Sequence, residues 1–328
     1  MIITRTPLRI PLGGGGTDIS SYSRLFGGFI LSAAIDKYMF ITVNRRPLDS
    51  RIRVSYSKTE IASCVDAIEH PLVREALRCT QTTGGIEITS ISDVPAGSGM
   101  GSSGAFAVGL LHALHTFHGR IVPRHQLAEE ACEIEIEKLG EPIGKHDQYI
   151  AAFGGVTCLE IDTSGKVEVV AARVSDDTLE LLERNLLLFW TGVERNASEI
   201  LSFQDQATRR NDQAVIRSLH EIKDIGRLVK TALEAGDVDQ FGELLHEHWC
   251  IKKKLSKSIS TARLDELYEV ARAGGARGGK VIGAGGGGFL MLYASQGHAR
   301  LREAMLQEGM VPMRFRFDHE GTRTLVNV

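Results

Sequence analysis

Clusters of glycine constrain this chain more than any other feature of its sequence. The 328 residues include 35 glycines, which gather conspicuously at residues 13–16, 97–104 and 283–288. Glycine inside a regular element is unfavourable, so a cluster marks a turn or a backbone that approaches a ligand closely. One such cluster could be a flexible turn, but three clusters bordered by apolar segments indicate a binding site.

The middle cluster matches two nucleotide-binding patterns in part. Residues 99–104 read G-x-G-x-x-G, but the dinucleotide-binding pattern needs this turn directly after a strand and an acidic residue about twenty positions later. Here residues 93–98 intervene, and a second helix is predicted where that acid and its strand should be. The cluster also begins like a P-loop, but Ala105 and Phe106 stand where lysine and serine or threonine are required. We therefore reject both patterns.

The physical property that both patterns share is still present. A glycine and serine loop that runs into a helix N-terminus presents backbone N–H groups and the positive end of the helix dipole, which bind anions such as phosphate. Ser102 and Ser103 stand where their hydroxyls can cap the helix, contact phosphate or reach a metal ion. The alternative is an ordinary helix cap, but four glycines exceed what a cap requires.

Hydrophobic periodicity predicts an α+β protein. The first ninety residues are mostly strand-like, whereas the second half combines strands with several amphipathic helices. Strands are predicted at 2–6, 29–35, 39–45, 51–57, 85–91, 154–161, 166–172, 185–192 and 312–317, and another follows the glycines at 283–288. Helices are predicted at 71–80, after the middle glycine cluster, from about 124, and near 196–210, 212–235, 237–256, 264–273 and 298–308. Polar residues at 173–180 suggest a division into two domains, residues 1–172 and 173–328.

Charge and composition exclude several classes of protein. A net charge of −3 provides no excess of positive charge for binding nucleic acid or an anionic membrane. The basic run at residues 252–254 falls in an amphipathic helix, where we expect a solvated face. The five cysteines are scattered and form no C-x-x-C pair, which argues against disulfides and structural zinc. Met1 leads directly into a strand-like segment, and no apolar run approaches the roughly 18–20 residues of a membrane span. We expect a cytoplasmic protein.

Residues suited to phosphoryl transfer follow the middle cluster. Such a reaction needs metal ligands and a group that accepts the proton of the acceptor hydroxyl. Asp147 follows a Gly-Lys-His run at a loop end, so it is a candidate for that group, and Lys145 and His146 are either its partners or solvated residues. Three glutamates alternate on a predicted helix and cannot all face one site at 100° per residue. These are Glu133, Glu135 and Glu137.

The first glycine cluster carries a second set of polar residues. Arg9 precedes the four glycines, and Thr17 and Asp18 end them. A polar pair on an open glycine turn is suited to binding the hydroxyls of a small polyol. The alternative is an ordinary hairpin turn in which Asp18 is a turn residue.

Taken together and in order, the three segments resemble a known family. "PLRIPLGGGGTD", "DVPAGSGMGSSGA" and "KVIGAGGGGFL" are similar to the three motifs of the GHMP small-molecule kinases, which include galactokinase, homoserine kinase and mevalonate kinase. The resemblance spans nearly the whole chain. It implies an N-terminal α+β ATP-binding domain with a left-handed βαβ crossover, a C-terminal ferredoxin-like domain, and a site between them.

The resemblance implies roles for individual residues. Asp147 matches the catalytic aspartate of the family, and Arg9 would support it and the transferred phosphoryl group. Mg²⁺ would bind Ser103 and Glu135, with Glu137 as the reserve ligand. The residues implied to bind the ATP phosphates are Gly97, Ser98, Gly99, Gly101, Ser102 and Ser103, and those implied to bind the substrate are Gly15, Thr17, Asp18 and Gly286.

Departures from the family pattern narrow the choice of substrate. Galactokinase-type sequences carry Gly-Glu-His-Thr-Asp in the first motif, but residues 14–18 here read Gly-Gly-Gly-Thr-Asp, which disfavours galactose. The form of the motifs in this sequence looks most like that of the heptose 7-phosphate kinases. These enzymes phosphorylate the anomeric hydroxyl of D-glycero-D-manno-heptose 7-phosphate to the 1,7-bisphosphate, toward nucleotide-activated heptose for surface glycans. That group usually has glutamine where His146 stands, so the identity of the sugar stays open.

The expected function is therefore ATP- and Mg²⁺-dependent phosphorylation of the C1 hydroxyl of a sugar phosphate. The alternatives are a related kinase for fucose, an N-acetylhexosamine, galactose or an isoprenoid precursor, and a sensor that binds sugar and ATP without turnover. The presence of Asp147 argues against a sensor, because binding alone does not need the base. The sequence does not locate the residues that bind the distal phosphate or fix the oligomeric state, and a homodimer is compatible with it.

Overall fold

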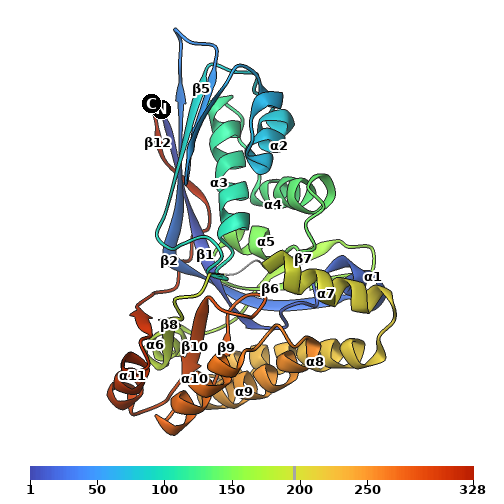
Figure 1. Ribbon diagram of the computed structural model, residues 1–328, viewed down its shortest axis with the longest axis vertical. Helices are drawn as coiled ribbons and strands as arrows, with labels where there is room; N and C mark the ends of the chain where they lie inside the picture. The colour runs from blue at the N-terminus through green and yellow to red at the C-terminus, as the bar shows by residue number, and fades with distance from the viewer. Residues whose placement is uncertain (195–196) are drawn as a thin grey trace.

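The strands of the computed structural model form two sheets (Figure 1), and the model describes residues 1–194 and 197–328. In these residues, the large sheet has the strand order β12-β1-β2-β5-β3-β4, with β6 paired to β2 and β7 paired to β6, and the small sheet has the order β11-β8-β10-β9. The strands are β1 (Ile2–Gly13), β2 (Gly28–Arg45), β3 (Ile52–Ser55), β4 (Thr59–Ala62), β5 (Ile86–Ser92), β6 (Val156–Ile161), β7 (Val167–Ala171), β8 (Leu186–Trp190), β9 (Gly278–Val281), β10 (Phe289–Tyr293), β11 (Val311–Met313) and β12 (Arg323–Asn327).

Helices cover one side of the large sheet and pack around the small one (Figure 1). In the first half they are α1 (Ser20–Phe26), η1 (Val65–Ala67), α2 (Pro71–Thr80), α3 (Ser102–Phe117), α4 (Arg124–Cys132), the π-helix η2 (Glu133–Lys138) and α5 (His146–Phe153). In the second half they are α6 (Asp176–Asn185), α7 (Ala197–Arg209), α8 (Gln213–Glu234), α9 (Val238–Leu255), α10 (Ala262–Ala273) and α11 (His298–Gln307). The predicted α+β class is confirmed.

The long strand β2 organises the large sheet. The sequence predicts two strands, at 29–35 and 39–45, whereas the structure has one strand of 18 residues. β2 pairs with β1 along most of its length, with β6 on its first half and with β5 on its second half. β3 and β5 run parallel, and the chain between them passes through α2, which makes a βαβ unit.

Helix α3 fixes the position of the middle glycine cluster. Most of its residues are buried, and it packs closely on β1, where the Thr4 hydroxyl donates to the Gly109 carbonyl at 2.9 Å. A Cβ at Gly109 would lie 2.7 Å from Thr6 Oγ1, so glycine permits this close approach. At the start of α3, the Arg9 N–H donates to the Met100 carbonyl at 3.1 Å. The glycine loop is thereby attached to β1 beside Arg9.

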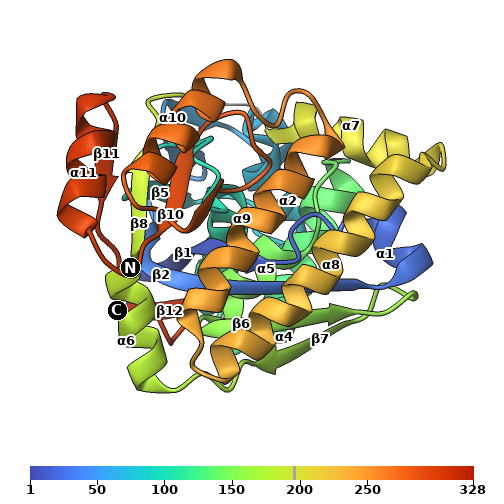
Figure 2. The same cartoon turned by 90° about the horizontal axis from the view of Figure 1, so that it is seen from below.

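The second half packs long helices against the small sheet. α9 packs on β9 of the small sheet, and α8, which lies beside α9 (Figure 2), packs on β1 and β2 of the large sheet. Trp249 and Phe241 of α9 are fully buried. The helix predicted from residue 196 is described from Ala197 onward, and the other helices predicted for this half are confirmed within a few residues. None of the helices described here is long and apolar enough to cross a membrane.

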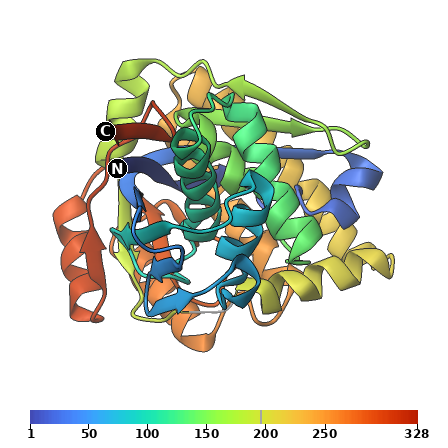
Figure 3. The same cartoon turned by 90° about the horizontal axis from the view of Figure 1, so that it is seen from above.

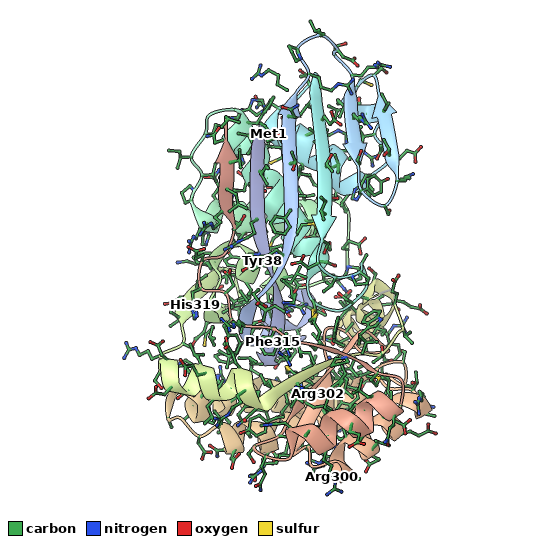
Figure 4. All side chains as sticks on the ribbon, turned by 90° about the vertical axis from the view of Figure 1, so that its left-hand side faces the viewer. Met1, Tyr38, Arg300, Arg302, Phe315 and His319 are labelled. Carbon is green, nitrogen blue, oxygen red and sulfur yellow. The ribbon has the colours of Figure 1, made fainter. Side chains whose placement is uncertain are left out.

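The end of the chain returns to the large sheet. β12 pairs antiparallel with β1, which places the two termini side by side (Figure 3). The segment before β12, which carries Phe315 and His319, crosses the junction between the two parts of the molecule (Figure 4). There the Tyr38 hydroxyl donates to Asp318 at 2.9 Å. Residues 323–327 therefore belong to the large sheet, and the division at residue 172 stays a prediction.

Candidate active site

A cavity of about 430 Å³ lies between the two halves of the chain, and all three glycine clusters contribute to its wall. Charged and polar side chains come from both halves. They include Arg9, Asp18, His70, Ser102, Ser103, Glu135, His146, Asp147 and Lys252.

The middle cluster has the conformation expected of an anion-binding loop. Gly97, Gly99 and Gly101 have φ values of +71°, +84° and +74°, which favour glycine, and all three line the cavity. Gly101 is the N-cap of α3, and within the described chain no side chain caps this helix end. The N–H groups of the first turn and the positive end of the helix dipole therefore face a site suited to phosphate. Ser102 and Ser103 line the same wall.

Ser98 is placed differently from the other residues of this loop. It is fully buried and does not line the cavity. Its carbonyl accepts the Phe289 N–H at 3.3 Å, and a Cβ at Gly288 would lie 2.4 Å from the same oxygen. Ser98 thus joins the middle glycine cluster to the third one.

Only the start of the third cluster lines the cavity. Gly286, which the resemblance implies to bind the substrate, does not. Gly283 and Ala284 line the wall, whereas Gly286 lies outside it and donates its N–H to the Ile259 carbonyl at 2.8 Å. Thr17 is also turned away from the cavity, because its buried hydroxyl donates to the carbonyls of Gly14 and Phe29 at 2.8 and 2.9 Å.

Asp147 and Arg9 form a paired contact in the cavity wall. Arg9 Nε and Nη2 donate to the two carboxylate oxygens of Asp147 at 2.8 and 2.9 Å, and Arg9 Nη1 donates to the Gly99 carbonyl. Burial tends to raise the pKa of Asp147, but Arg9 and then His146 outweigh it and hold that pKa well below its usual range. The carboxylate is therefore ionised and fixed in orientation at neutral pH.

His146 joins Asp147 to Asp18, a connection that the sequence does not show. Its Nδ1 lies 3.0 Å from Asp18 Oδ2, which also accepts its backbone N–H at 3.1 Å, and its Nε2 lies 2.8 Å from Asp147 Oδ1. Burial alone would lower the pKa of His146, but Asp147 and Asp18 raise it to about 9. Burial tends to raise the pKa of Asp18, and His146 lowers it below the usual value. A charged network Arg9–Asp147–His146–Asp18 results.

Close packing holds this network against the glycine loop. A Cβ at Gly104 would lie 2.8 Å from Asp147 Cβ, and one at Gly144 would lie 2.0 Å from Asp18 Oδ2. By contrast, Gly15 has open space around it on the cavity side. Lys145 is turned away, since its ammonium lies 3.1 Å from the carboxylate of Glu129.

Glu135 is the glutamate of the three that reaches the cavity. It is 1% exposed, its Oε1 accepts the Ser103 hydroxyl, and its Oε2 accepts Gln148 Nε2 at 2.6 Å. Glu133 and Glu137 are exposed. Burial raises the pKa of Glu135 to about 7, against the lowering effect of the Ser103 and Gln148 hydrogen bonds.

The Ser103–Glu135 pair fits a magnesium ion. Mg²⁺ prefers oxygen ligands and commonly binds one or two protein groups together with substrate phosphates. A buried carboxylate that contacts only neutral donors within the described chain, next to a hydroxyl at the start of the phosphate loop, supplies such ligands. Elsewhere in the described residues no group of three or more histidine, cysteine or acidic side chains could hold a metal.

The basic run at residues 252–254 is not uniformly solvated, which corrects the prediction from the sequence. Lys252 is 9% exposed and lines the cavity, where its ammonium donates to the carbonyls of Gly283 and, at 3.4 Å, Val281. Lys253 instead pairs with Asp265 at 2.9 Å. Helical phase could have revealed this, because residue 252 continues the buried face that includes Trp249.

Comparison with known proteins identifies the family. Residues 63–155 match the model of the GHMP kinases N-terminal domain, and residues 229–311 match that of the GHMP kinases C-terminal domain. The chain is also 30% identical to a D-glycero-α-D-manno-heptose 7-phosphate kinase of Campylobacter jejuni, with 98% of each chain covered. The chain belongs to the GHMP kinase family. ATP binding is typical of this family of transferases.

Solved structures agree with this assignment. A D-glycero-D-manno-heptose 1-phosphate kinase from Bacteroides thetaiotaomicron has a TM-score of 0.83 at 28% identity, with all of both chains covered. The galactokinase of Lactococcus lactis, solved with galactose, has a TM-score of 0.76 at 20% identity, with 98% of this chain and 94% of that one covered, and it supports the fold alone. The two-domain GHMP kinase fold expected from the resemblance is confirmed.

Proposed function

We propose that this GHMP kinase transfers the γ-phosphoryl group of ATP to the C1 hydroxyl of a heptose 7-phosphate. The favoured acceptor is D-glycero-D-manno-heptose 7-phosphate, giving the 1,7-bisphosphate for nucleotide-activated heptose and surface glycans. The observation that carries the proposal is the Arg9–Asp147–His146–Asp18 network, which spans the wall between the phosphate loop and the first glycine cluster. The names of two similar proteins, both heptose phosphate kinases, support the choice of sugar.

Each part of the network has a distinct task in this proposal. Asp18, held by His146 beside the open turn at Gly15, accepts hydrogen bonds from sugar hydroxyls. Asp147 accepts a hydrogen bond from the C1 hydroxyl, orients it and receives its proton. Because phosphoryl transfer has a loose transition state, the proton leaves late, and an aspartate with a lowered pKa suffices. Positioning and charge stabilisation supply most of the acceleration.

The phosphate donor binds along the glycine loop next to this network in this proposal. Backbone N–H groups at Gly97, Gly99 and Gly101 and the first turn of α3 bind its phosphates. Arg9 offsets charge near the transferred group. Ser103 and Glu135 would hold Mg²⁺, and the bound ion would neutralise negative charge on the phosphates. The requirement for ATP and the absence of disulfides among the five cysteines favour a cytoplasmic enzyme.

The acceptor is tested by measuring ADP release with ATP and Mg²⁺ over a panel of sugars. The panel contains heptose 7-phosphate, unphosphorylated heptose, fucose, an N-acetylhexosamine, galactose and mevalonate. We expect the highest kcat/KM for heptose 7-phosphate, and phosphorus NMR should show a new anomeric phosphate. Preference for another acceptor would overturn the choice of sugar. Tight binding of sugar and ATP with no turnover would support the sensor instead.

A further inference from the structure

Helix α7 covers one side of the cavity with a single face. Positions 197, 201 and 204 follow each other at spacings of four and three, which places them on one side of a helix. The α7 residues that line the cavity are Ala197, Ser198, Leu201 and Gln204. The helix itself packs against α1 and α8 (Figure 1). None of these four side chains takes part in the phosphoryl transfer proposed above, so the wall that they form is available for another task.

Two hydrogen bonds attach α7 to the first half of the chain. The Ser198 hydroxyl donates to Glu141 Oε2 at 2.6 Å, and Gln204 Nε2 donates to the Gly16 carbonyl at 2.9 Å. Both acceptor residues line the cavity. The second bond brings α7 against the glycine turn that leads to Asp18. Gln204 therefore adjoins the part of the site that is proposed to bind sugar hydroxyls.

The amide group of Gln204 is packed closely on this turn. A Cβ at Gly16 would lie 3.1 Å from Gln204 Oε1 and 3.2 Å from Gln204 Nε2. Gln204 is 6% exposed, and its hydrogen bond to Gly16 fixes the direction of the amide. Binding a ligand therefore costs little further side-chain entropy at this position.

Part of the hydrogen-bonding capacity of this amide is unused. A primary amide has two N–H donors and an oxygen that accepts. One N–H of Gln204 is bound to the Gly16 carbonyl, and no residue of the described chain donates to Oε1. An acceptor and a second donor, held in a fixed direction at the cavity wall, thus remain for a ligand.

Gln204 complements Asp18 in what it offers a sugar. A sugar hydroxyl both donates and accepts hydrogen bonds, but the carboxylate of Asp18 only accepts, and it already accepts from His146. The Gln204 amide both accepts and donates. Gln204 contacts Gly16, and Asp18 is two residues further on, so both lie at the turn where Gly15 has open space. The turn is thereby suited to two hydroxyls of one sugar, one for each side chain.

We propose that Gln204 determines specificity for the acceptor, by forming a hydrogen bond with a sugar hydroxyl that does not react. The inference rests on the proposed function, because the C1 hydroxyl is there assigned to Asp147 and the hydroxyls beside the first glycine cluster to Asp18. It makes α7 the wall of the acceptor site that the second half of the chain supplies.

The test compares wild type and Gln204→Met with heptose 7-phosphate and with its 2-, 3-, 4- and 6-deoxy analogues. Methionine has a similar size but no amide. Removal of the hydroxyl that meets Gln204 should lower the wild-type kcat/KM by about 3- to 10-fold, the effect of one hydrogen bond between neutral groups. Gln204→Met should show this loss with the intact sugar, and removal of the same hydroxyl should then change its kcat/KM by no more than about twofold.

The other hydroxyls and ATP provide internal controls. Gln204→Met should respond to the other three deoxy analogues as the wild type does, and its KM for ATP should stay within about twofold. Because acceptors are compared within one variant, partial loss of folded enzyme cancels from the ratios. Gln204→Asn, which withdraws the amide by one methylene, should give the same pattern.

Gln206→Met is the matched control, since Gln206 is an exposed residue of the same helix and lies outside the cavity. It should leave all constants unchanged. The proposal is overturned if Gln204→Met lowers kcat/KM by one common factor for the intact sugar and every analogue. That result is expected if Gln204 only holds Gly16 in place. An unchanged kcat/KM for the intact sugar would also overturn it.

The wild-type measurements separate this inference from the proposed function. An enzyme that uses heptose 7-phosphate, but whose response to every deoxy analogue is unaltered by Gln204→Met, contradicts the role of Gln204 alone. If another sugar is preferred, its own deoxy forms decide the role in the same way. If sugar binds without turnover, Kd replaces kcat/KM in the comparison. A preferred acceptor that is not a sugar, such as mevalonate, contradicts both proposals.

Discussion

Two carboxylates in the wall of one cavity, the partly exposed Asp147 and the buried Glu135, have opposite surroundings. Asp147 is bound by Arg9 on both oxygens and lies beside His146, and these cations keep its pKa well below the usual range. Glu135 contacts the neutral donors Ser103 and Gln148, and burial raises its pKa to about 7. In the described chain, no cationic side chain contacts Glu135.

The contrast indicates which positive charges in the site come from the protein and which come from its ligands. A carboxylate already paired with fixed cations needs nothing more to be ionised and oriented, which suits a group that must meet the acceptor hydroxyl in one geometry. A buried carboxylate without a cation gains most when a metal ion arrives. The comparison predicts that changes at Asp147 impair the reaction and the fold, whereas changes at Glu135 impair the metal dependence alone.

The largest effect is expected from Asp147→Asn. This change removes the group that orients the acceptor hydroxyl and takes its proton, which lowers kcat by about 10³-fold. The ATP phosphates are bound in this proposal by backbone N–H groups of the glycine loop and not by the Asp147 side chain, so ATP affinity should change by no more than about twofold. ADP release at saturating substrates and calorimetric titration of ATP measure the two quantities. Turnover near that of the wild type would show that Asp147 is not the base.

Gly104→Ala tests whether the fixed position of Asp147 matters as much as its charge. A methyl group at Gly104 would lie 2.8 Å from Asp147 Cβ and 3.1 Å from the Asp147 carbonyl carbon, so Asp147 must shift. A displacement of about 1 Å at a reacting group lowers turnover by about 100-fold. We expect this loss in kcat with the melting temperature reduced only slightly. An unchanged kcat would mean that the position of the carboxylate is not critical.

Glu135→Gln tests the other member of the comparison. Loss of the charge should raise the Mg²⁺ concentration needed for half-maximal activity by about 10- to 100-fold, the range seen for changes around metal sites. Without Mg²⁺ the free energy of unfolding should be unchanged or higher, because an uncompensated buried charge is removed. Asp147→Asn should instead lower it, since Arg9 and His146 lose a charged partner.

Glu137→Gln is the control for this measurement, because Glu137 is exposed. It should alter neither the Mg²⁺ requirement nor the stability. If Glu135→Gln destabilised the enzyme as much as Asp147→Asn, or left the Mg²⁺ requirement unchanged, the contrast between the two carboxylates would not hold.

Local sequence predicted those parts of the fold that depend on local patterns. The helix at 71–80 has the predicted bounds, because strong amphipathic periodicity coincides with a proline at its start. β2 was predicted as two strands because residues 36–38 are polar and interrupt the pattern. The pairing with β1 shifts register there but resumes on both sides, so the strand continues. β12 was not predicted, since its place is set by pairing with β1 at the other end of the chain.

In the site, too, some features follow from sequence motifs and others depend on contacts between distant residues. The resemblance to the GHMP kinases implied that Arg9, Asp147 and the phosphate loop share one site, and the structure brings them together. The contact between His146 and Asp18 joins residues 128 positions apart, which no local pattern encodes. Lys252 was assigned to solvent because all three lysines were placed together on the solvated face of an amphipathic helix, whereas helical phase directs one of them inward.

The smallest effect at neutral pH, and the most specific one, is expected from His146→Gln. The protonated imidazole lies between Asp147 and Asp18, with the charge of Arg9 opposing it, and its pKa is raised to about 9. Because this pKa is raised above the value of about 6.5 for an unfolded chain, the stabilisation is full below pH 6.5 and is lost as the pH rises through about 9. The same loss of charge leaves two carboxylates on either side of a neutral ring, so activity should fall over the same range.

Glutamine retains an N–H donor of similar reach but does not titrate. We therefore expect His146→Gln to lower kcat/KM by about threefold to tenfold at pH 7, the value of one charge-assisted hydrogen bond reduced to a neutral one. The wild-type pH profile should have an alkaline limb with an apparent pKa of about 9. That limb should be absent from the variant. A limb of unchanged position in His146→Gln would mean that another group titrates there, and that the charge on His146 does not hold Asp18 and Asp147 in their working arrangement.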